Sequence, residues 1–175
     1  MVERLPLVVW YKALAKNKAF ISGRLTVKKL PKLSQLCPSC HSSIEALLGF
    51  EWSFAYDCVL LTMEVDATLD LECQRCLNQM QWGIQLQNQL CIVDSNAKAG
   101  QLPHNTDYYV CASDKMAIAD LIEDELLLVI PQNPMHNSRD ECNADFISYL
   151  NRYRHRSQKD ESPFKVLEGN IETAE

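Results

Sequence analysis

The sequence has few glycines and no long apolar run. Its five glycines form no Gly-rich phosphate loop, and there is no Gly-x-Ser-x-Gly element, so neither nucleotide hydrolysis nor a serine hydrolase is supported. The longest apolar stretches, residues 5–11 and 126–131, are far shorter than the ~20 residues of a membrane-spanning helix. The amino terminus lacks the pattern of a secretory signal. We therefore expect a cytoplasmic protein that does not contact a membrane.

Cysteine, by contrast, is abundant. The chain has eight cysteines, a number that would indicate a disulfide scaffold in a small secreted domain. In a cytoplasmic protein they are expected to be reduced thiols, metal ligands or core residues, and their spacing must decide between these roles. Two pairs have the Cys-x-x-Cys spacing: Cys37 with Cys40, and Cys73 with Cys76.

Charge is divided unevenly along the chain. The net charge is -6, but residues 1–32 contain eight basic residues and one acidic residue, whereas residues 33–145 contain four basic and 17 acidic residues. A basic segment can neutralise phosphates, and an acidic body repels nucleic acid. The predicted RNA-binding residues of this basic amino-terminal arm are Lys12, Lys16, Lys18, Lys28 and Lys29. The alternative is that these lysines only solvate a surface helix or strand.

A second basic segment lies near the carboxyl terminus. Arg152, Arg154 and Arg156 alternate with Tyr153 and His155. This pattern offers phosphate contacts together with aromatic stacking, and we predict that the three arginines bind RNA. They share one face only if the segment is extended, and the end of a surface helix is an equally consistent reading.

The middle of the chain has the alternation of β-strands. Residues 59–71 and 80–92 each alternate between apolar and polar side chains, and only a short Cys-x-x-Cys segment separates them. This arrangement predicts an antiparallel hairpin with one buried face. Residues 50–56 predict a further strand of the same sheet, and residues 108–111 predict a short strand after an exposed loop at 95–106.

Helical spacing replaces the alternation at residues 117–130, with Asp114 as the expected N-cap and Pro131 as the stop. Asp120, Glu123 and Asp124 are expected on its polar side. We predict that this acidic face receives a basic protein partner. Two alternatives remain, a solvated surface and a magnesium-dependent nuclease site.

The order of these elements, strands first and helices afterwards, predicts an α+β fold. We expect an antiparallel β-sheet with a central Cys-x-x-Cys hairpin, packed against the acidic amphipathic helix and a carboxy-terminal helix. Residues 1–150 are expected to form a single domain that includes the basic arm, and residues 151–175 a charged, flexible tail.

Three segments carry a resemblance to a known family: LDLECQRC at residues 69–76, IADLIEDELLLVIP at 118–131 and SPFKVL at 162–167. They resemble the YceD family of large ribosomal RNA subunit accumulation proteins. The resemblance implies a role in the accumulation or processing of large-subunit (23S) ribosomal RNA, and the family has no established catalytic activity, so we expect a non-enzymatic factor. The expected partners are that RNA or its precursor and, at the acidic helix face, a basic ribosomal protein.

The resemblance also bears on the cysteines. Many relatives carry a cysteine-rich segment after the acidic helix, and this chain retains only His136 and Cys142 there. Together with Cys73 and Cys76 they would supply four ligands for one structural zinc ion. Two alternatives stay open. The two Cys-x-x-Cys pairs would together make a zinc-dependent nucleic-acid-binding regulator, and reduced thiols would simply pack the hairpin turn.

Overall fold

The computed structural model describes residues 4–37 and 42–157, with side chains through Tyr153. The described chain divides into two compact units. The first, here called the sheet unit, comprises the residues up to Glu72 together with Gln79–Pro134. The second, here called the cysteine unit, comprises Cys73–Asn78 and the residues from Met135 onward.

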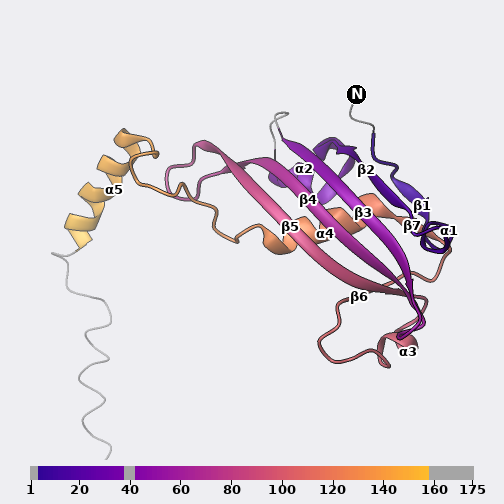
Figure 1. Ribbon diagram of the computed structural model, residues 1–175. Coiled ribbons are helices and arrows are strands. Elements are labelled where there is room, and N and C mark those ends of the chain that lie inside the picture. Colours follow the sequence, from indigo (N-terminus) through magenta and orange to yellow (C-terminus); the bar gives the residue numbers. More distant parts are fainter. Residues whose placement is uncertain (1–3, 38–41, 158–175) are drawn as a thin grey trace, which may run out of the picture. The chain divides into compact units, whose positions relative to one another are not determined.

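The sheet unit is built on a five-stranded sheet in the order β2-β3-β4-β5-β6 (Figure 1). Its strands are β2 (Phe20–Leu25), β3 (Ser43–Ser53), β4 (Cys58–Glu72), β5 (Gln79–Val93) and β6 (Tyr108–Val110). The first four strands pair antiparallel, and β6 pairs parallel with β5. The predicted hairpin is confirmed, because β4 and β5 pair from Glu72 opposite Gln79 to Val59 opposite Ile92.

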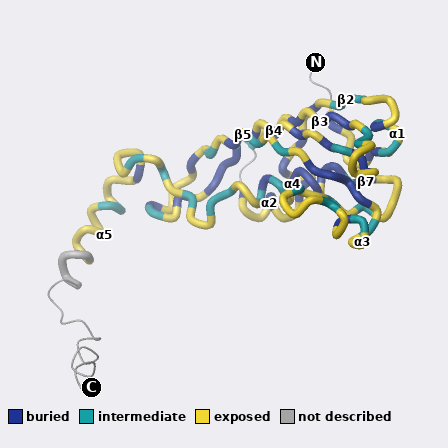
Figure 2. The backbone as a smooth tube through the Cα atoms, turned by 60° about the horizontal axis from the view of Figure 1, so that its bottom comes forward, coloured by how far each residue is buried: buried dark blue, intermediate teal, exposed yellow. Residues whose placement is uncertain are grey.

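One face of the sheet is buried, as strand alternation requires. In β4 the buried side chains include Leu61, Met63 and Val65, whereas Glu64 and Asp66, at alternate positions, are exposed. Figure 2 shows the same contrast along the strands. Burial of one such apolar side chain contributes about 1.5–3 kcal/mol, so the repetition of the pattern along four strands gives the unit an ordinary hydrophobic core.

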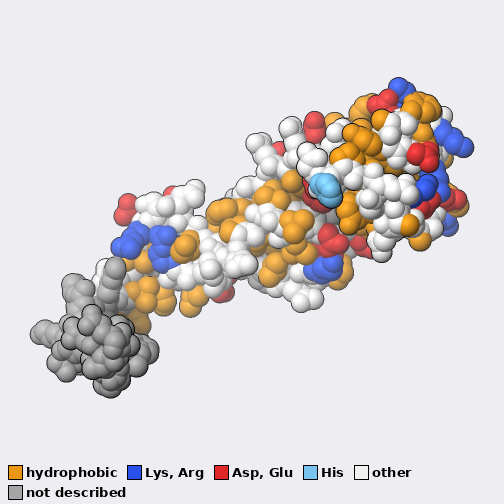
Figure 3. Space-filling model, turned by 90° about the horizontal axis from the view of Figure 1, so that it is seen from below, with side chains coloured by type: hydrophobic (Ala, Val, Ile, Leu, Met, Phe, Trp, Pro, Cys, Tyr) orange, Lys and Arg blue, Asp and Glu red, His pale blue; other side chains and the backbone are white. Residues whose placement is uncertain are grey.

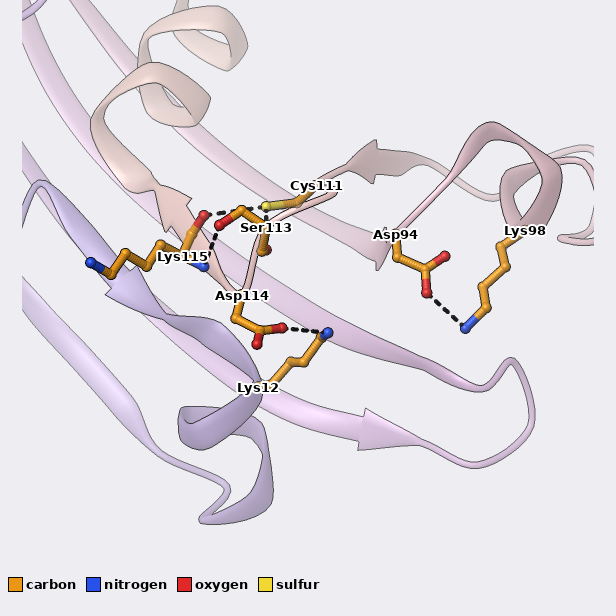
Figure 4. A network of polar contacts seen from close by, with 7 residues as sticks. All are labelled: Lys12, Asp94, Lys98, Cys111, Ser113, Asp114 and Lys115. Carbon is orange, nitrogen blue, oxygen red and sulfur yellow. Dashed lines mark hydrogen bonds and ion pairs between the residues drawn. The ribbon is translucent and has the colours of Figure 1, made fainter.

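The predicted helix at residues 117–130 is confirmed as α4 (Ile118–Val129). Its buried residues Leu121, Ile122 and Leu126 belong to the same core cluster as the strands. The expected N-cap was wrong. Ala117 occupies the cap position, without a side-chain cap, and Asp114 instead accepts a hydrogen bond from Lys12 Nζ at 2.6 Å (Figure 4).

Short elements that the sequence did not predict complete the sheet unit. They are β1 (Val8–Trp10), α1 (Tyr11–Lys16), η1 (Val27–Lys29), α2 (Pro31–Leu36), α3 (Asn96–Ala99) and β7 (Lys115–Ala117). β1 and β7 form a two-stranded antiparallel sheet. Tyr11, Leu30 and Leu33 from these segments are fully buried in the core. The basic amino-terminal segment is therefore folded where it is described.

The cysteine unit contains one described helix, α5 (Ala144–Ser157), so the expected carboxy-terminal helix is confirmed. Its first turn is capped by Asn143, whose Oδ1 accepts hydrogen bonds from the N–H groups of Asp145 at 2.9 Å and Phe146 at 3.3 Å. Residues 158–175 of the predicted tail lie outside the described residues. With strands and helices in these places the fold class is α+β, as predicted. No described helix has the length and apolar character needed to cross a membrane.

Candidate metal centre

The first half of the candidate centre is the turn that joins β4 to β5. The Cys73 N–H donates to the Asn78 carbonyl at 2.9 Å, and the Leu77 N–H donates to the Cys73 carbonyl at 2.8 Å. Leu77 adopts a left-handed backbone with φ of 59°, which costs a non-glycine residue about 1–2 kcal/mol. The backbone of this turn is therefore strained at Leu77, next to the buried side chain of Cys76. The side chain of Cys73 is buried as well.

The second half lies in the segment that precedes α5. The Asp140 N–H donates to Ser138 Oγ at 3.1 Å, and the Cys142 N–H donates to the Arg139 carbonyl at 3.1 Å. These bonds fold the chain into a tight turn. Cys142 is the residue before Asn143, the N-cap of α5. A metal ion bound to the Cys142 sulfur would therefore be linked to the start of the helix.

Four side chains converge in the cysteine unit. His136 Nδ1 lies 3.5 Å from Cys76 Sγ and 3.6 Å from Cys142 Sγ. These three atoms and Cys73 Sγ all lie within 4.8 Å of one another. A tetrahedral zinc ion with Zn–S bonds of ~2.3 Å and Zn–N bonds of ~2.0–2.1 Å requires a sulfur-to-nitrogen separation of about 3.5 Å. The donor set and its spacing therefore fit zinc.

Few side chains of the cysteine unit are buried where its burial is described. In that part the buried side chains are Cys73, Cys76 and Cys142, and residues 144–153 of α5 are exposed or half-buried (Figure 2). A segment that buries so little apolar surface does not offset the conformational entropy of folding. An additional bond network, such as a metal centre, would supply the missing stabilisation.

The pKa values of two thiols in the cluster shift in opposite directions. Burial raises the pKa of Cys73, but hydrogen bonds from the backbone N–H groups of His136, Arg75 and Cys76 outweigh it and lower this pKa to about 6. Burial, together with hydrogen bonds to the Cys76 and Cys73 sulfurs, raises the pKa of Cys142 to about 11. Without a metal, thiolate charge is therefore favoured on Cys73 and opposed on Cys142. A divalent cation would relieve that opposition.

Arg75, between the two cysteines of the turn, adds a positive charge that the sequence reasoning missed. Its guanidinium Nη1 lies 4.0 Å from Cys142 Sγ, and its Nη2 donates to the His136 carbonyl at 3.5 Å. Three thiolates around a dication leave one net negative charge, which this guanidinium would balance. The sequence did contain a signal for this role, because a basic residue, Arg75, lies between the two cysteines of the Cys-x-x-Cys pair.

The second Cys-x-x-Cys pair lies elsewhere. Cys37 is a buried member of the hydrophobic core of the sheet unit, and burial raises the pKa of its thiol. Cys40 lies outside the described residues. Within the described chain, the partners that accompany Cys73 and Cys76 are therefore His136 and Cys142.

The acidic helix has a structural use that the sequence did not reveal. Glu123 is 2% exposed, and its Oε1 accepts hydrogen bonds from the N–H groups of Lys32 at 2.7 Å and Leu33 at 2.9 Å. It thereby caps the first turn of α2, whose N–H groups have no partner within the helix. The expectation that Glu123 lies on the exposed side of the helix was wrong, because the start of α2 packs beside it. Asp120 and Asp124 are exposed, and Asp124 pairs with the Lys32 ammonium.

The predicted RNA-binding lysines lie in folded parts of the sheet unit. Lys12 and Lys18 are in ion pairs with Asp114 and Glu51. The remaining three are exposed and have no ion pair within the described residues; they are Lys16, Lys28 and Lys29.

The predicted arginine segment is helical. Positions 152, 154 and 156 all belong to α5, so they do not share a face as they would in an extended chain. Arg152 is exposed, and the side chains of Arg154 and Arg156 lie outside the described residues. Along the same helix the rings of Tyr149 and Tyr153 lie 4.7 Å apart, with about half of each residue exposed. Basic and hydrophobic side chains are adjacent on the surface in this part of the chain (Figure 3).

Comparison with known proteins decides the family. Residues 61–169 match the family described as "Large ribosomal RNA subunit accumulation protein YceD". The chain belongs to the YceD family. The matched residues include most of β4, all of β5 and α4, and the four side chains of the YceD cysteine unit. No curated protein and no solved structure shows significant similarity to the chain.

Proposed function

We propose that this YceD family member is a non-enzymatic, cytoplasmic factor for the accumulation or processing of large-subunit ribosomal RNA. It acts by binding that RNA or its precursor, a ribosomal protein, or both. The observation that carries the proposal is the family match over residues 61–169, since the family is described by the accumulation of the large ribosomal RNA subunit.

The proposed role of the cluster is to hold one structural zinc ion. Four protein ligands fill a tetrahedral shell and leave no open position for a reacting water, which supports a structural site. The ligands of this site would be Cys73, Cys76, His136 and Cys142. Zinc would join the hairpin turn to the segment that begins α5, and it would stabilise a unit whose described part buries almost nothing else.

In this proposal α5 supplies one RNA contact. The exposed rings of Tyr149 and Tyr153 are suited to stacking on unpaired bases, and the neighbouring Arg152 is suited to a phosphate contact. Lys16, Lys28 and Lys29 of the sheet unit would add electrostatic contacts. We further propose that exposed Asp120 and Asp124 receive a basic ribosomal protein. Since Glu123 is buried, it would support α2 instead of contacting a partner.

The biological proposal is tested in cells that lack the gene. We expect the ratio of large-subunit to small-subunit ribosomal RNA to fall, and to be restored by the intact chain and by Cys111→Ser. A double Cys73→Ser, Cys76→Ser variant should fail to restore it. Crosslinking followed by sequencing and mass spectrometry should recover large-subunit RNA or a ribosomal protein. An unchanged ratio together with recovery of neither species would contradict the proposal.

Metal analysis of the purified chain tests the zinc assignment separately. The intact protein and Cys111→Ser should each hold about one zinc ion, because Cys111 is half-buried and, among the described residues, its Sγ bonds to the Ser113 and Lys115 backbone carbonyls. Cys142→Ser should lose the ion. Zinc lost on Cys37→Ser but retained on Cys142→Ser would favour the zinc-dependent regulator instead.

A further inference from the structure

β5 has a long edge that no described strand occupies. On one side it pairs with β4 along its length, from Gln79 to Ile92. On its other side β6 pairs only with Cys91, Ile92 and Val93 (Figure 1). Residues 79–90 therefore form a free strand edge within the part of the chain that the structure describes.

The backbone groups that point to this edge can be identified. The Cys91 N–H donates to the Asp107 carbonyl at 2.9 Å, and the Val93 carbonyl accepts from the Cys111 N–H at 2.8 Å, both on the β6 side. Residues two apart in a strand direct their N–H and C=O groups to the same side. The odd-numbered residues of β5 therefore face the free edge. The Gln89 N–H is already bonded, at 2.7 Å, to Asn88 Oδ1, so the available groups belong to residues 79–87.

This edge lacks the usual protection. Natural sheets guard exposed edges with charged side chains, prolines or bulges. β5 contains no charged residue and no proline in its 15 residues, and its register with β4 is continuous without a bulge. At Gly83 an added Cβ would meet nothing within 4 Å, so the outer face of β5 is open at this position.

The two faces beside the edge differ in chemistry. On the outer face Asp66 lies opposite Gln85 and Glu64 opposite Gln87. Both acids are exposed and have no ion pair within the described chain. They and the glutamines line two hollows of about 590 and 420 Å³. These hollows would admit long polar side chains, and their charge favours basic ones.

On the core face the edge is apolar. Trp82 and Leu86 are half-buried and pack against the core cluster. α4 lies beside this part of β5, since Asn88 Nδ2 donates to Glu125 Oε2 at 2.9 Å. One turn further along the helix, Leu128 and Val129 are exposed. Apolar side chains of an added strand would cover such surface.

We propose that residues 79–87 of β5 are a docking edge for an extended segment of a partner protein. The side chains of that segment would alternate between apolar residues facing the core side and Lys or Arg on the outer face, where these long side chains can reach across β5 toward Glu64 and Asp66. Strand addition supplies the backbone hydrogen bonds, and the two faces supply the selectivity. The inference is independent of the zinc site and of the RNA contact.

Charge argues for this partner over a second copy of the chain. The strand that a second copy would offer is β5 itself, which carries no charged side chain. Pairing of two copies would therefore leave Glu64 and Asp66 without a counter-charge. A basic strand supplies that counter-charge.

Amide hydrogen exchange of the full chain, with an end-capped peptide of about ten alternating Lys and Val residues as the probe, tests the proposal. Without peptide, the amides of residues 81, 83, 85 and 87 should exchange quickly, and those of 82, 84 and 86 slowly. The Lys-Val peptide should protect the fast set. A matched Glu-Val peptide should not.

Two variants complete the test. Gly83→Pro removes an N–H that faces the edge and not β4, so it should weaken peptide binding about tenfold or more while β4–β5 pairing persists. Should that variant fail to fold, Gln85→Lys serves instead, because it can pair with Asp66 and would repel a basic strand. Gln101→Lys, in an exposed loop, is its charge-matched control. Three outcomes would overturn the proposal: no protection by the Lys-Val peptide, equal protection by both peptides, or odd-numbered amides already protected in the free chain, through dimerisation or its own covering segment.

Discussion

The two units of this chain are stabilised in different ways. The sheet unit has a continuous hydrophobic core to which strands and α4 contribute, with residues such as Leu61 and Ile122 completely inaccessible to solvent. In the described part of the cysteine unit, the buried side chains are three cysteines. If the proposed zinc site is correct, one chain combines a unit that folds by apolar burial with one that depends on a few coordinating side chains.

The largest expected effect follows from removing the proposed zinc ion. A strong zinc chelator should abolish the helical signal of α5 and the exchange protection of residues 135–153, since structural zinc sites contribute roughly 10–16 kcal/mol of apparent binding free energy. The thermal transition of the sheet unit should stay in place. Circular dichroism and hydrogen exchange before and after chelation measure both. Simultaneous loss of the two units would show that the division proposed here is wrong.

A core truncation should give the opposite pattern. Leu61→Ala removes a completely buried side chain and should lower the free energy of unfolding of the sheet unit by about 2–5 kcal/mol. Zinc affinity should be unaffected. The matched control is Leu128→Ala in α4, an exposed leucine of the same unit, where the change should stay within about 0.5 kcal/mol. Urea titration and zinc competition assays separate these effects.

An intermediate effect is expected at Glu123. Glu123→Leu leaves the N–H groups of Lys32 and Leu33 without their acceptor, which should cost the sheet unit about 1–3 kcal/mol. The matched control, Asp120→Leu, changes an exposed acid of the same helix and should have little effect. An equal loss of unfolding free energy in the two variants would contradict the capping role assigned to Glu123.

A smaller effect is expected at the helix cap beside the cluster. Asn143→Ala removes the acceptor for two first-turn N–H groups of α5 and should cost about 0.5–2 kcal/mol. Because Cys142 precedes this cap, zinc affinity should fall slightly with it. Asn137→Ala, at an exposed position before the turn, is the control. Unchanged affinity in Asn143→Ala would uncouple α5 from the metal centre.

The smallest effect concerns protons. The pKa of Cys73 is lowered to about 6 from the ordinary value of 9.0, so its contribution to stability is complete above pH 9.0 and is lost as the pH falls through about 6. Without zinc the unit is expected to unfold and to lose the hydrogen bonds that lower this pKa, so the Cys73 thiol is then protonated below pH 9.0. Zinc binding should therefore release fewer protons per ion above pH 9 than at pH 7. Calorimetry in buffers of different ionisation enthalpy measures this release, and an equal release on the two sides of pH 9 would contradict it.

Sequence reasoning predicted the elements in which a hydrophobic pattern repeats over many residues. Thirteen alternating residues at 59–71 indicated β4, and helical spacing at 117–130 indicated α4 to within a residue at each end. The elements it missed, such as β1 and α2, have three to six residues and show no readable period. The strand predicted at residues 50–56 was right only for residues 50–53. β3 begins at Ser43, before the readable alternation, and residues 54–56 belong to the turn that leads to β4.

The candidate site was predicted in part, and the reason is similar. The spacing of Cys73 and Cys76 marked one pair of ligands, but the choice of His136 and Cys142 came from the family resemblance. The role of Glu123 depends on a helix start 90 residues earlier in the chain. No local pattern carries such a contact, because it arises only when the core brings α2 and α4 together.

X-ray absorption at the zinc edge of the purified, full-length chain tests the central claim most directly. The account predicts one ion with three sulfur ligands at ~2.3 Å and one nitrogen ligand at ~2.0–2.1 Å, with the nitrogen signal lost on His136→Ser. A shell of four sulfurs, or a protein that holds no zinc when purified without chelator, would contradict it.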